Sequence, residues 1–183
     1  MPRPLLYSEK PVGSQAIILI VGPVMSARRS FAQDLLARGY GKYILIPAFH
    51  KVIGPDGKTR RWHPPQIPQK ATSSYDTTLT MRHRWPYEYM EDTHRELLLG
   101  KEMMDHLGLH SANIVSSPYH MRRISIIAHH VFGPHAYTLQ FVPTTYGPQP
   151  SLLWWTDRNQ IWWVFHEWGK IIWFLVYSSF CNP

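Results

Sequence analysis

Hydroxyl, imidazole and guanidinium side chains gather in one short stretch, residues 116–123, which reads SSPYHMRR. A histidine can take up or release a proton near neutral pH, so His120 is the candidate acid or base. An arginine can bind a carboxylate or phosphate through two hydrogen bonds, which makes Arg123 a candidate for anion binding. We expect the neighbouring polar residues to bind the same ligand: Ser116, Ser117 and Tyr119. The alternative is that these residues are polar helix caps and surface charge.

A second candidate site follows the first apolar run of the chain, in the stretch GPVMSARR. The backbone at Gly22 and the start of a helix can present N–H groups to an anion, and Ser26 and Arg28 lie close by in sequence. The stretch has one glycine where a dinucleotide fingerprint has three, and there is no P-loop lysine. The competing interpretation is a tight strand-to-helix turn with Ser26 as the helix cap.

A third cluster, YEYMEDTHREL, surrounds the start of a predicted helix. Glu88 and Glu96 are candidate catalytic carboxylates that position a ligand hydroxyl or amine, and a divalent ion is another partner for such groups. Thr93 and Arg95 are candidate ligand-binding residues. The alternative is that the acidic side chains only complement the dipole of the helix.

Other kinds of site find less support. The chain has eleven histidines, but no pair of them has a third ligand at zinc-like spacing, so we expect no metal site. The chain has no G-x-S-x-G motif, and Cys181 has no base nearby in sequence, so nucleophilic catalysis is not indicated.

The elements that must position these clusters alternate between strands and helices. Apolar runs bounded by glycine or polar residues predict strands within 15–22, 42–49, 112–117 and 136–144. Helical spacing of apolar residues predicts helices within 26–39, 91–109 and 121–133, which end at Gly39, Gly108 and Gly133. This order predicts an α/β fold with three Rossmann-like layers, a mostly parallel sheet and helices on both faces. The three clusters then converge at the carboxyl edge of the sheet.

Two further segments stand out. Residues 54–85 are basic and rich in proline, which predicts a long loop that either covers the site or is a solvated surface segment. Residues 160–178 form an aromatic, apolar C-terminal helix that carries His166, Glu167 and Lys170 in its middle. These charges argue against a membrane span, and they favour a core helix over an interfacial membrane anchor.

Composition sets the remaining bounds. A chain of 183 residues with 44% hydrophobic residues is suited to a single domain over residues 1–183. The formal charge of +7 favours a small anionic ligand; charge alone also allows nucleic acid, which we do not expect as the partner. The apolar run from Ala16 to Val21 is too short for a signal segment, so we expect a cytoplasmic protein. The sequence leaves the oligomeric state open.

Together the clusters resemble the YdcF/SanA/ElyC-like family, a domain of unknown function with a Rossmann-like fold. The family's motif R-x3-A-x2-L-x3-G is matched by Arg28, Ala32, Leu35 and Gly39. Its motif S-x-N-T-x-E-N is matched only at Thr93, with Asp92, Arg95 and Glu96 at the other positions. Its motif T-S-x-Y-H-M-x-R resembles the stretch that holds Ser116, Ser117, Tyr119, His120, Met121 and Arg123. A C-terminal Glu-x-x-Lys is also similar, here Glu167 and Lys170.

The chain also departs from the family's pattern. The multiple-glycine turn is reduced to Gly22-Pro23, the Ser-Gly-Gly after the second strand is replaced by IPAF, and the basic loop replaces a helix with Glu-Ala. These are ligand-facing segments of the family, so its ligand is not carried over directly.

The resemblance implies a soluble protein that binds an adenosyl or other nucleotide-like anionic ligand, with S-adenosylmethionine as the suggested cofactor. In one interpretation it is an enzyme in which His120 is the acid or base. In the other it is a non-catalytic binding or regulatory module linked to envelope or cell-wall metabolism, docked peripherally on a membrane through the aromatic C-terminal helix. The sequence leaves both open.

Overall fold

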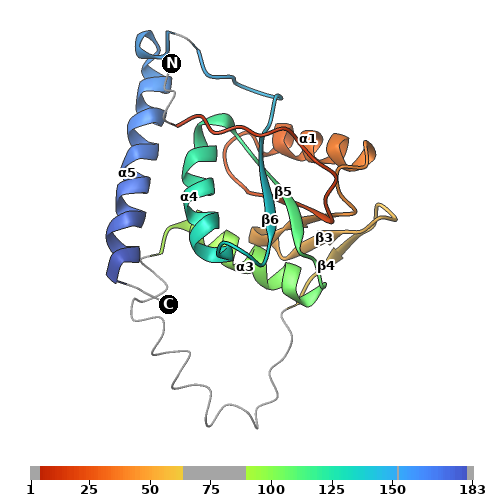
Figure 1. Ribbon diagram of the computed structural model, residues 1–183. Helices are drawn as coiled ribbons and strands as arrows, with labels where there is room; N and C mark the ends of the chain where they lie inside the picture. The colour runs from red at the N-terminus through yellow and green to blue at the C-terminus, as the bar shows by residue number, and fades with distance from the viewer. Residues whose placement is uncertain (1–4, 64–89, 152, 181–183) are drawn as a thin grey trace.

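The computed structural model describes residues 5–63, 90–151 and 153–180, which form one six-stranded mixed sheet with helices around it (Figure 1). The strands are β1 (Ala16–Leu19), β2 (Tyr43–Ile46), β3 (Lys51–Ile53), β4 (Thr59–Arg61), β5 (Ser111–Ser116) and β6 (Thr138–Pro143). Their order across the sheet is β4-β3-β2-β1-β5-β6. Strands β2, β1, β5 and β6 are parallel, and β3 and β4 extend the edge in antiparallel pairs. This arrangement confirms the predicted α/β fold with a mostly parallel sheet.

The side chains of β1 explain the layers, because successive residues of a strand point to opposite faces of a sheet. Ile17 and Leu19 pack with apolar residues of α1 (Met25–Ala37) on one face. Ile18 packs on the other face with residues of α3 (Asp92–His106) and α4 (Met121–Phe132). The sheet therefore lies between two layers of helices, as expected for a Rossmann-like arrangement.

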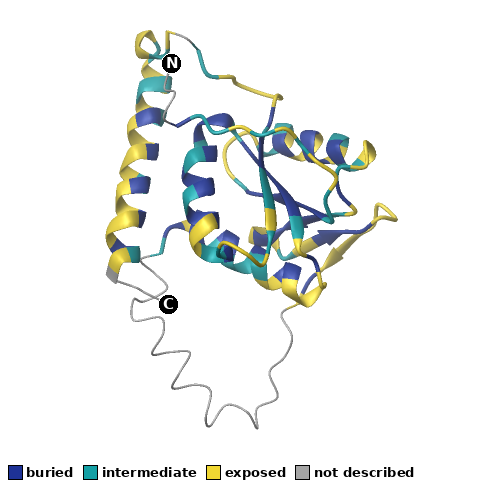
Figure 2. Ribbon diagram, viewed as in Figure 1, coloured by how far each residue is buried: buried dark blue, intermediate teal, exposed yellow. Residues whose placement is uncertain are grey.

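Helix α5 (Arg158–Phe180) lies outside these layers, alongside α4 (Figure 1). Its buried residues recur every three or four positions, so that one face is covered, and the other face is exposed (Figure 2). The buried set is Val164, Glu167, Ile171, Phe174 and Tyr177. The expectation of a core helix is therefore met by one face only. Among the described segments, no helix has both the length and the apolar character needed to cross a membrane.

The prediction of a long loop from residue 54 is wrong for its first eight residues, 54–61. Residues 54–58 are the turn of the β3–β4 hairpin, in which the Gly54 N–H donates to the Lys58 carbonyl and Arg60 pairs with Asp56. Three exposed residues, Thr59–Arg61, carry no apolar alternation, so the sequence pattern gave no signal for this strand. The rest of the predicted loop, residues 64–85, and the candidate Glu88 lie outside the described residues.

The predicted helix ends at Gly39, Gly108 and Gly133 are confirmed, but the predicted cap at Ser26 is wrong. Helix α1 begins at Met25, with Val24 as its N-cap two residues before the predicted one, and Ser26 lies exposed in the first turn. Ser26 therefore lies inside the helix, beyond the N-cap position from which a serine hydroxyl accepts the backbone N–H groups of the first turn.

The centre of the sheet is where its connections diverge. Strands β1 and β5 are neighbours, but α1 follows β1 on one face and α4 follows β5 on the other. The loops that leave these two strands therefore separate, and in α/β sheets a crevice opens beyond the carboxyl ends at such a point.

Asn113, fully buried on β5, fixes the segment that leads into β1. Its side-chain NH2 donates to the carbonyls of Val12 and Tyr40 and to the Ser14 hydroxyl, at 2.7–2.9 Å.

We predict that Asn113→Asp lowers the free energy of unfolding by about 3 kcal/mol, because a carboxylate would face acceptors that need a donor. Urea denaturation at pH 7 measures this. The exposed Asn159→Asp is the control, and equal stability of the two variants would contradict the prediction.

Candidate functional site

Three connected hollows form a groove along the carboxyl edge of the sheet. The central hollow, with a volume of about 160 Å³, lies over the divergence of β1 and β5, and its lining includes Gly22, Thr93, Glu96, Ser116 and His120. A polar hollow of about 320 Å³ shares Val21, Asp92 and Glu96 with it and extends to His50 and Arg95. An aromatic hollow of about 170 Å³ shares Pro23, His120 and Lys170 with the central one and is lined by Tyr119, Trp162 and Trp163.

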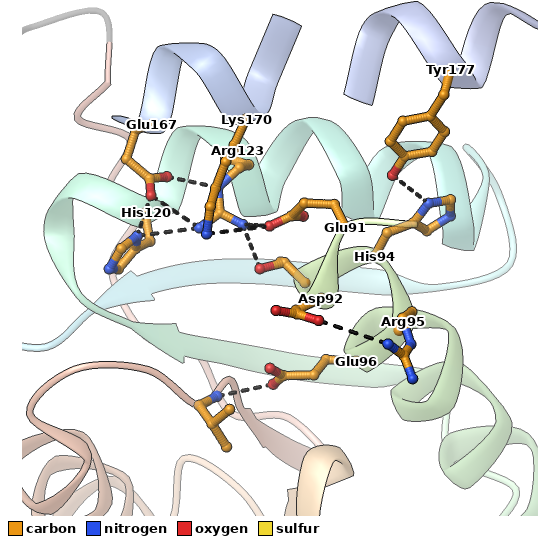
Figure 3. Close-up of polar contacts among 12 residues, drawn as sticks. Glu91, Asp92, His94, Arg95, Glu96, His120, Arg123, Glu167, Lys170 and Tyr177 are labelled. Atoms are coloured by element: carbon orange, nitrogen blue, oxygen red, sulfur yellow. Dashed lines mark hydrogen bonds and ion pairs between the residues drawn. The ribbon is translucent and has the colours of Figure 1, made fainter. Parts of the chain in front are cut away.

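Arg123 lies at the base of the central hollow and binds groups from two other helices (Figure 3). Its Nε and Nη2 donate to the two carboxylate oxygens of Glu167 on α5, at 2.7 and 3.1 Å. Its Nη1 donates to the carboxylate of Glu91 and to the hydroxyl of Thr93, at the start of α3. One guanidinium therefore joins α3, α4 and α5.

The charges of this cluster stabilise one another. Burial opposes the charge of Arg123, but the hydrogen bonds and charges of Glu167 and Glu91 outweigh it and raise the Arg123 pKa. Burial would raise the pKa of Glu167, but His120 and Arg123 lower it from 4.5 to about 2. The stability that Glu167 provides is thus fully present above about pH 4.5 and is lost as pH falls towards 2.

His120 and Glu167 form an imidazole–carboxylate pair in the wall of the groove. His120 Nδ1 lies 2.8 Å from Glu167 Oε1, and the imidazole side chain is 22% exposed. Arg123 Nη2 also approaches Nδ1, at 3.3 Å, but the shorter contact is to an ionised carboxylate, which only accepts. We therefore assign the hydrogen to Nδ1, which leaves the Nε2 lone pair as an acceptor. Burial lowers the pKa of His120 in spite of Glu167, so the ring favours the neutral form. A neutral imidazole oriented by a carboxylate is suited to act as a general base.

Glu96 is a carboxyl group that holds its proton up to neutral pH. Its Oε2 accepts the Val21 N–H at 2.9 Å, and its side chain is otherwise enclosed between the central and polar hollows. Burial raises the pKa of Glu96 to about 7, although the Val21 N–H and the charge of Arg28 favour ionisation. A protonated carboxyl and a neutral imidazole in the lining of the same central hollow give it both a proton donor and a proton acceptor.

Arg28 lies under the β1–α1 turn and explains why residue 22 is a glycine. Its Nη1 donates to the carbonyls of Ile20 and Val21, and its Nε donates to the Ser117 hydroxyl. A Cβ at Gly22 would lie 2.6 Å from Nη1 and 2.8 Å from Nη2, and Gly22 has φ 153°. Burial lowers the Arg28 pKa to about 10.

Two buried polar atoms beside the central hollow have no partner among the described residues. They are the hydroxyl of Ser116, which lines the hollow, and Nη2 of Arg28, which lies beneath the Gly22 turn. Both lie at the carboxyl ends of β1 and β5, where the first two sequence clusters were expected to converge. Groups of this kind are normally satisfied, so their position next to a hollow points to a ligand that accepts hydrogen bonds.

The backbone is strained at the groove. In the described segments, Val24 and His50 are the non-glycine residues with positive φ, at 59° and 49°. This conformation is rare for a β-branched side chain such as that of Val24. Both residues line the groove, Val24 at its aromatic hollow and His50 at its polar hollow. Such strain concentrates at functional sites.

The structure separates the predicted site residues into groups. Groove-lining residues are Gly22, Thr93, Arg95, Glu96, Ser116, Ser117, Tyr119, His120 and Arg123. Arg28 supports the groove from below, Arg95 pairs with Asp92 at 3.8 Å in the polar hollow, and the Tyr119 hydroxyl donates to Gln160. Ser26 is not part of the lining.

Sequence reasoning did not select Glu91, Glu167 or Lys170 as site residues, although Glu167 completes the His120 pair. Lys170 Nζ lies 3.9 Å from Glu91, and both α5 residues enter the site from outside the sheet layers (Figure 3). A signal did exist: charges in the middle of an apolar helix must find partners when that helix packs on the protein.

No three metal-binding side chains gather anywhere in the described ranges. Comparisons of the chain with models of protein families, with curated proteins and with solved structures found no match, so the function rests on the geometry of the groove.

We predict that Glu167→Gln destabilises the fold by about 3 kcal/mol, because it leaves the buried Arg123 with Glu91 as its remaining charged partner. Chemical denaturation at pH 7 tests this. Glu102→Gln, on the exposed surface of α3, is the matched control. Equal stability of both variants would show that the Arg123 cluster does not hold the helices together.

We predict that Glu96→Gln stabilises the protein at pH 8 by about 1–3 kcal/mol and has little effect near pH 4. The folded chain keeps the Glu96 proton up to about pH 7, whereas the usual pKa is 4.5, so stability falls as pH rises between these values. Glutamine can still accept the Val21 N–H without the cost of a buried charge. Urea denaturation across this pH range gives the comparison, and a gain independent of pH would contradict the assignment.

Proposed function

We propose that the groove binds a small anionic ligand of the adenosyl or other nucleotide-like class, and that His120 and Glu96 exchange protons with it. The observation that carries the proposal is the pairing of a carboxylate-oriented imidazole with a carboxyl group of pKa about 7 in one hollow. Opposed protonation states of this kind are the arrangement used for acid–base catalysis at neutral pH.

The two ends of the site support this ligand class. An anionic group has the Ser116 hydroxyl available in the central hollow, which has no partner in the described protein, and the charge of Arg28 lies beneath the adjoining Gly22 turn. A flat ring has Tyr119, Trp162 and Trp163 beside it in the aromatic hollow. A nucleotide-like molecule carries both parts. S-adenosylmethionine, which the family resemblance suggests, has a carboxylate for the first and an adenine for the second, although its ammonium and sulfonium groups make it a cation overall.

A non-catalytic binding module is the second candidate, and the Arg123 cluster favours it. The Arg123 guanidinium already has Glu91, Glu167 and Thr93 as partners, so it needs no ligand to balance its charge, although the buried Oε2 of Glu91 has no partner among the described residues. In that case the same groove holds its ligand without turnover, and a role in envelope or cell-wall metabolism, as the resemblance implies, belongs to this candidate.

The first experiment is a thermal-shift screen of the wild type and Ser116→Ala against S-adenosylmethionine, S-adenosylhomocysteine, nucleotides and nucleotide sugars at low salt. A ligand at about 100 times its Kd stabilises the fold by about 2.7 kcal/mol. Ser116→Ala removes a hydroxyl that has no protein partner, so we expect an intact fold and about tenfold weaker binding. The exposed Ser30→Ala is the control. A panel without any shift would refute the ligand class.

His120→Gln then separates the two candidates. If the protein is an enzyme, this variant binds the identified ligand but loses turnover by about 100-fold or more, because the general base is gone. Product formation is followed by chromatography of the ligand incubated with each protein. A wild type that binds the ligand and leaves it unchanged supports the binding module.

A further inference from the structure

Helix α5 is apolar on both its faces, whereas a surface helix of a water-soluble protein has a polar outward face. Within residues 161–179 its charged side chains are Glu167 and Lys170, and both turn inward to the Arg123 cluster (Figure 3). Glu167 is 1% exposed. The outward side is instead apolar, with Phe165 69%, Trp162 60% and Ile172 58% exposed.

This outward side is continuous, and we call it the α5 outer face. It consists of Trp162, Phe165, Trp168, Ile172, Trp173, Leu175 and Val176, with Trp155 just before the helix. The exposed His166 lies among them, with its ring stacked on Trp162. At 1.5 Å per residue it extends about 21 Å along the helix. Figure 2 shows the same exposed strip on the side of α5 that points away from α4. An apolar patch of this kind marks a surface that is covered in the working state of a protein.

We propose that the α5 outer face docks on an anionic lipid surface, with the helix lying in the plane of the membrane interface. Six of the eight tryptophans of the chain lie within residues 154–173. Tryptophan is the residue that prefers the boundary between acyl chains and headgroups. Helices that lie in this boundary bury Trp, Phe and Leu to a shallow depth, and they need no length sufficient to span the bilayer.

Charge favours anionic lipid over a second copy of the chain. Nineteen Lys and Arg against twelve Asp and Glu give the protein a formal charge of +7. That charge attracts the protein to anionic headgroups, whereas two copies facing each other through α5 would repel. Beside the face, the charges of Asp157 and Arg158 offset each other at the start of the helix, and from residue 161 to 179 no exposed carboxylate lies on it to repel anionic headgroups.

The test is sedimentation of the full chain with vesicles of equal parts phosphatidylglycerol and phosphatidylcholine, and with vesicles of phosphatidylcholine alone. We expect binding to the anionic vesicles that weakens as salt is raised, with a blue shift of tryptophan fluorescence. The double variant Phe165→Glu/Ile172→Glu should lower the partition coefficient by about tenfold or more. Both side chains are exposed, so the fold is retained, which circular dichroism and Tm verify.

The matched control is Val12→Glu/Phe49→Glu, which adds the same two charges at exposed apolar positions away from α5. It should bind vesicles as the wild type does, apart from the small electrostatic loss. Absence of wild-type binding to anionic vesicles, or equal binding of the two double variants, would overturn the proposal. A dimer in sedimentation equilibrium that Phe165→Glu/Ile172→Glu dissociates, without vesicle binding, would assign the face to a second copy. None of these outcomes depends on the ligand of the groove.

Discussion

The fold depends on how the buried guanidinium of Arg123 is neutralised. Removing such a charge from water costs several kcal/mol, which is recovered only with well-placed carboxylates. Glu91 supplies one from the start of α3 and Glu167 supplies the other from α5. Because these groups belong to different helices, the requirement for charge balance fixes how α3, α4 and α5 pack. The same helices line the groove beyond the sheet, so the charge balance of Arg123 also holds the sides of the groove in place.

The two faces of helix α5 consequently have different roles. Its inward face orients His120 through Glu167 and lines the aromatic hollow with Trp163, whereas its outer face leaves a strip of apolar side chains exposed. Trp162 belongs to both, since it lines the hollow and is also 60% exposed. The site and the proposed docking surface therefore share one rigid element.

Much of this architecture could be predicted from the sequence, because the signals were local. Apolar runs and glycine stops defined the central strands and helices, and the polar stretches after β1 and β5 correctly converged on one edge of the sheet. The partner of His120 could not be found in this way, since Glu167 lies 47 positions away on a helix outside the layers. The type of a residue also does not show which groups its hydrogen-bond donors bind. Arg123 was predicted to bind an anionic ligand, but its N–H groups donate to the carboxylates of Glu167 and Glu91.

The order in which the chain is made gives the Glu167 contact a further consequence. Synthesis proceeds from the N-terminus, so Glu91, His120 and Arg123 leave the ribosome before α5 does. The sheet and its two helical layers can assemble at that stage with the Arg123 charge only partly compensated. The second carboxylate, the orientation of the imidazole and the aromatic wall all come from α5, so the groove is complete only when this last helix is in place.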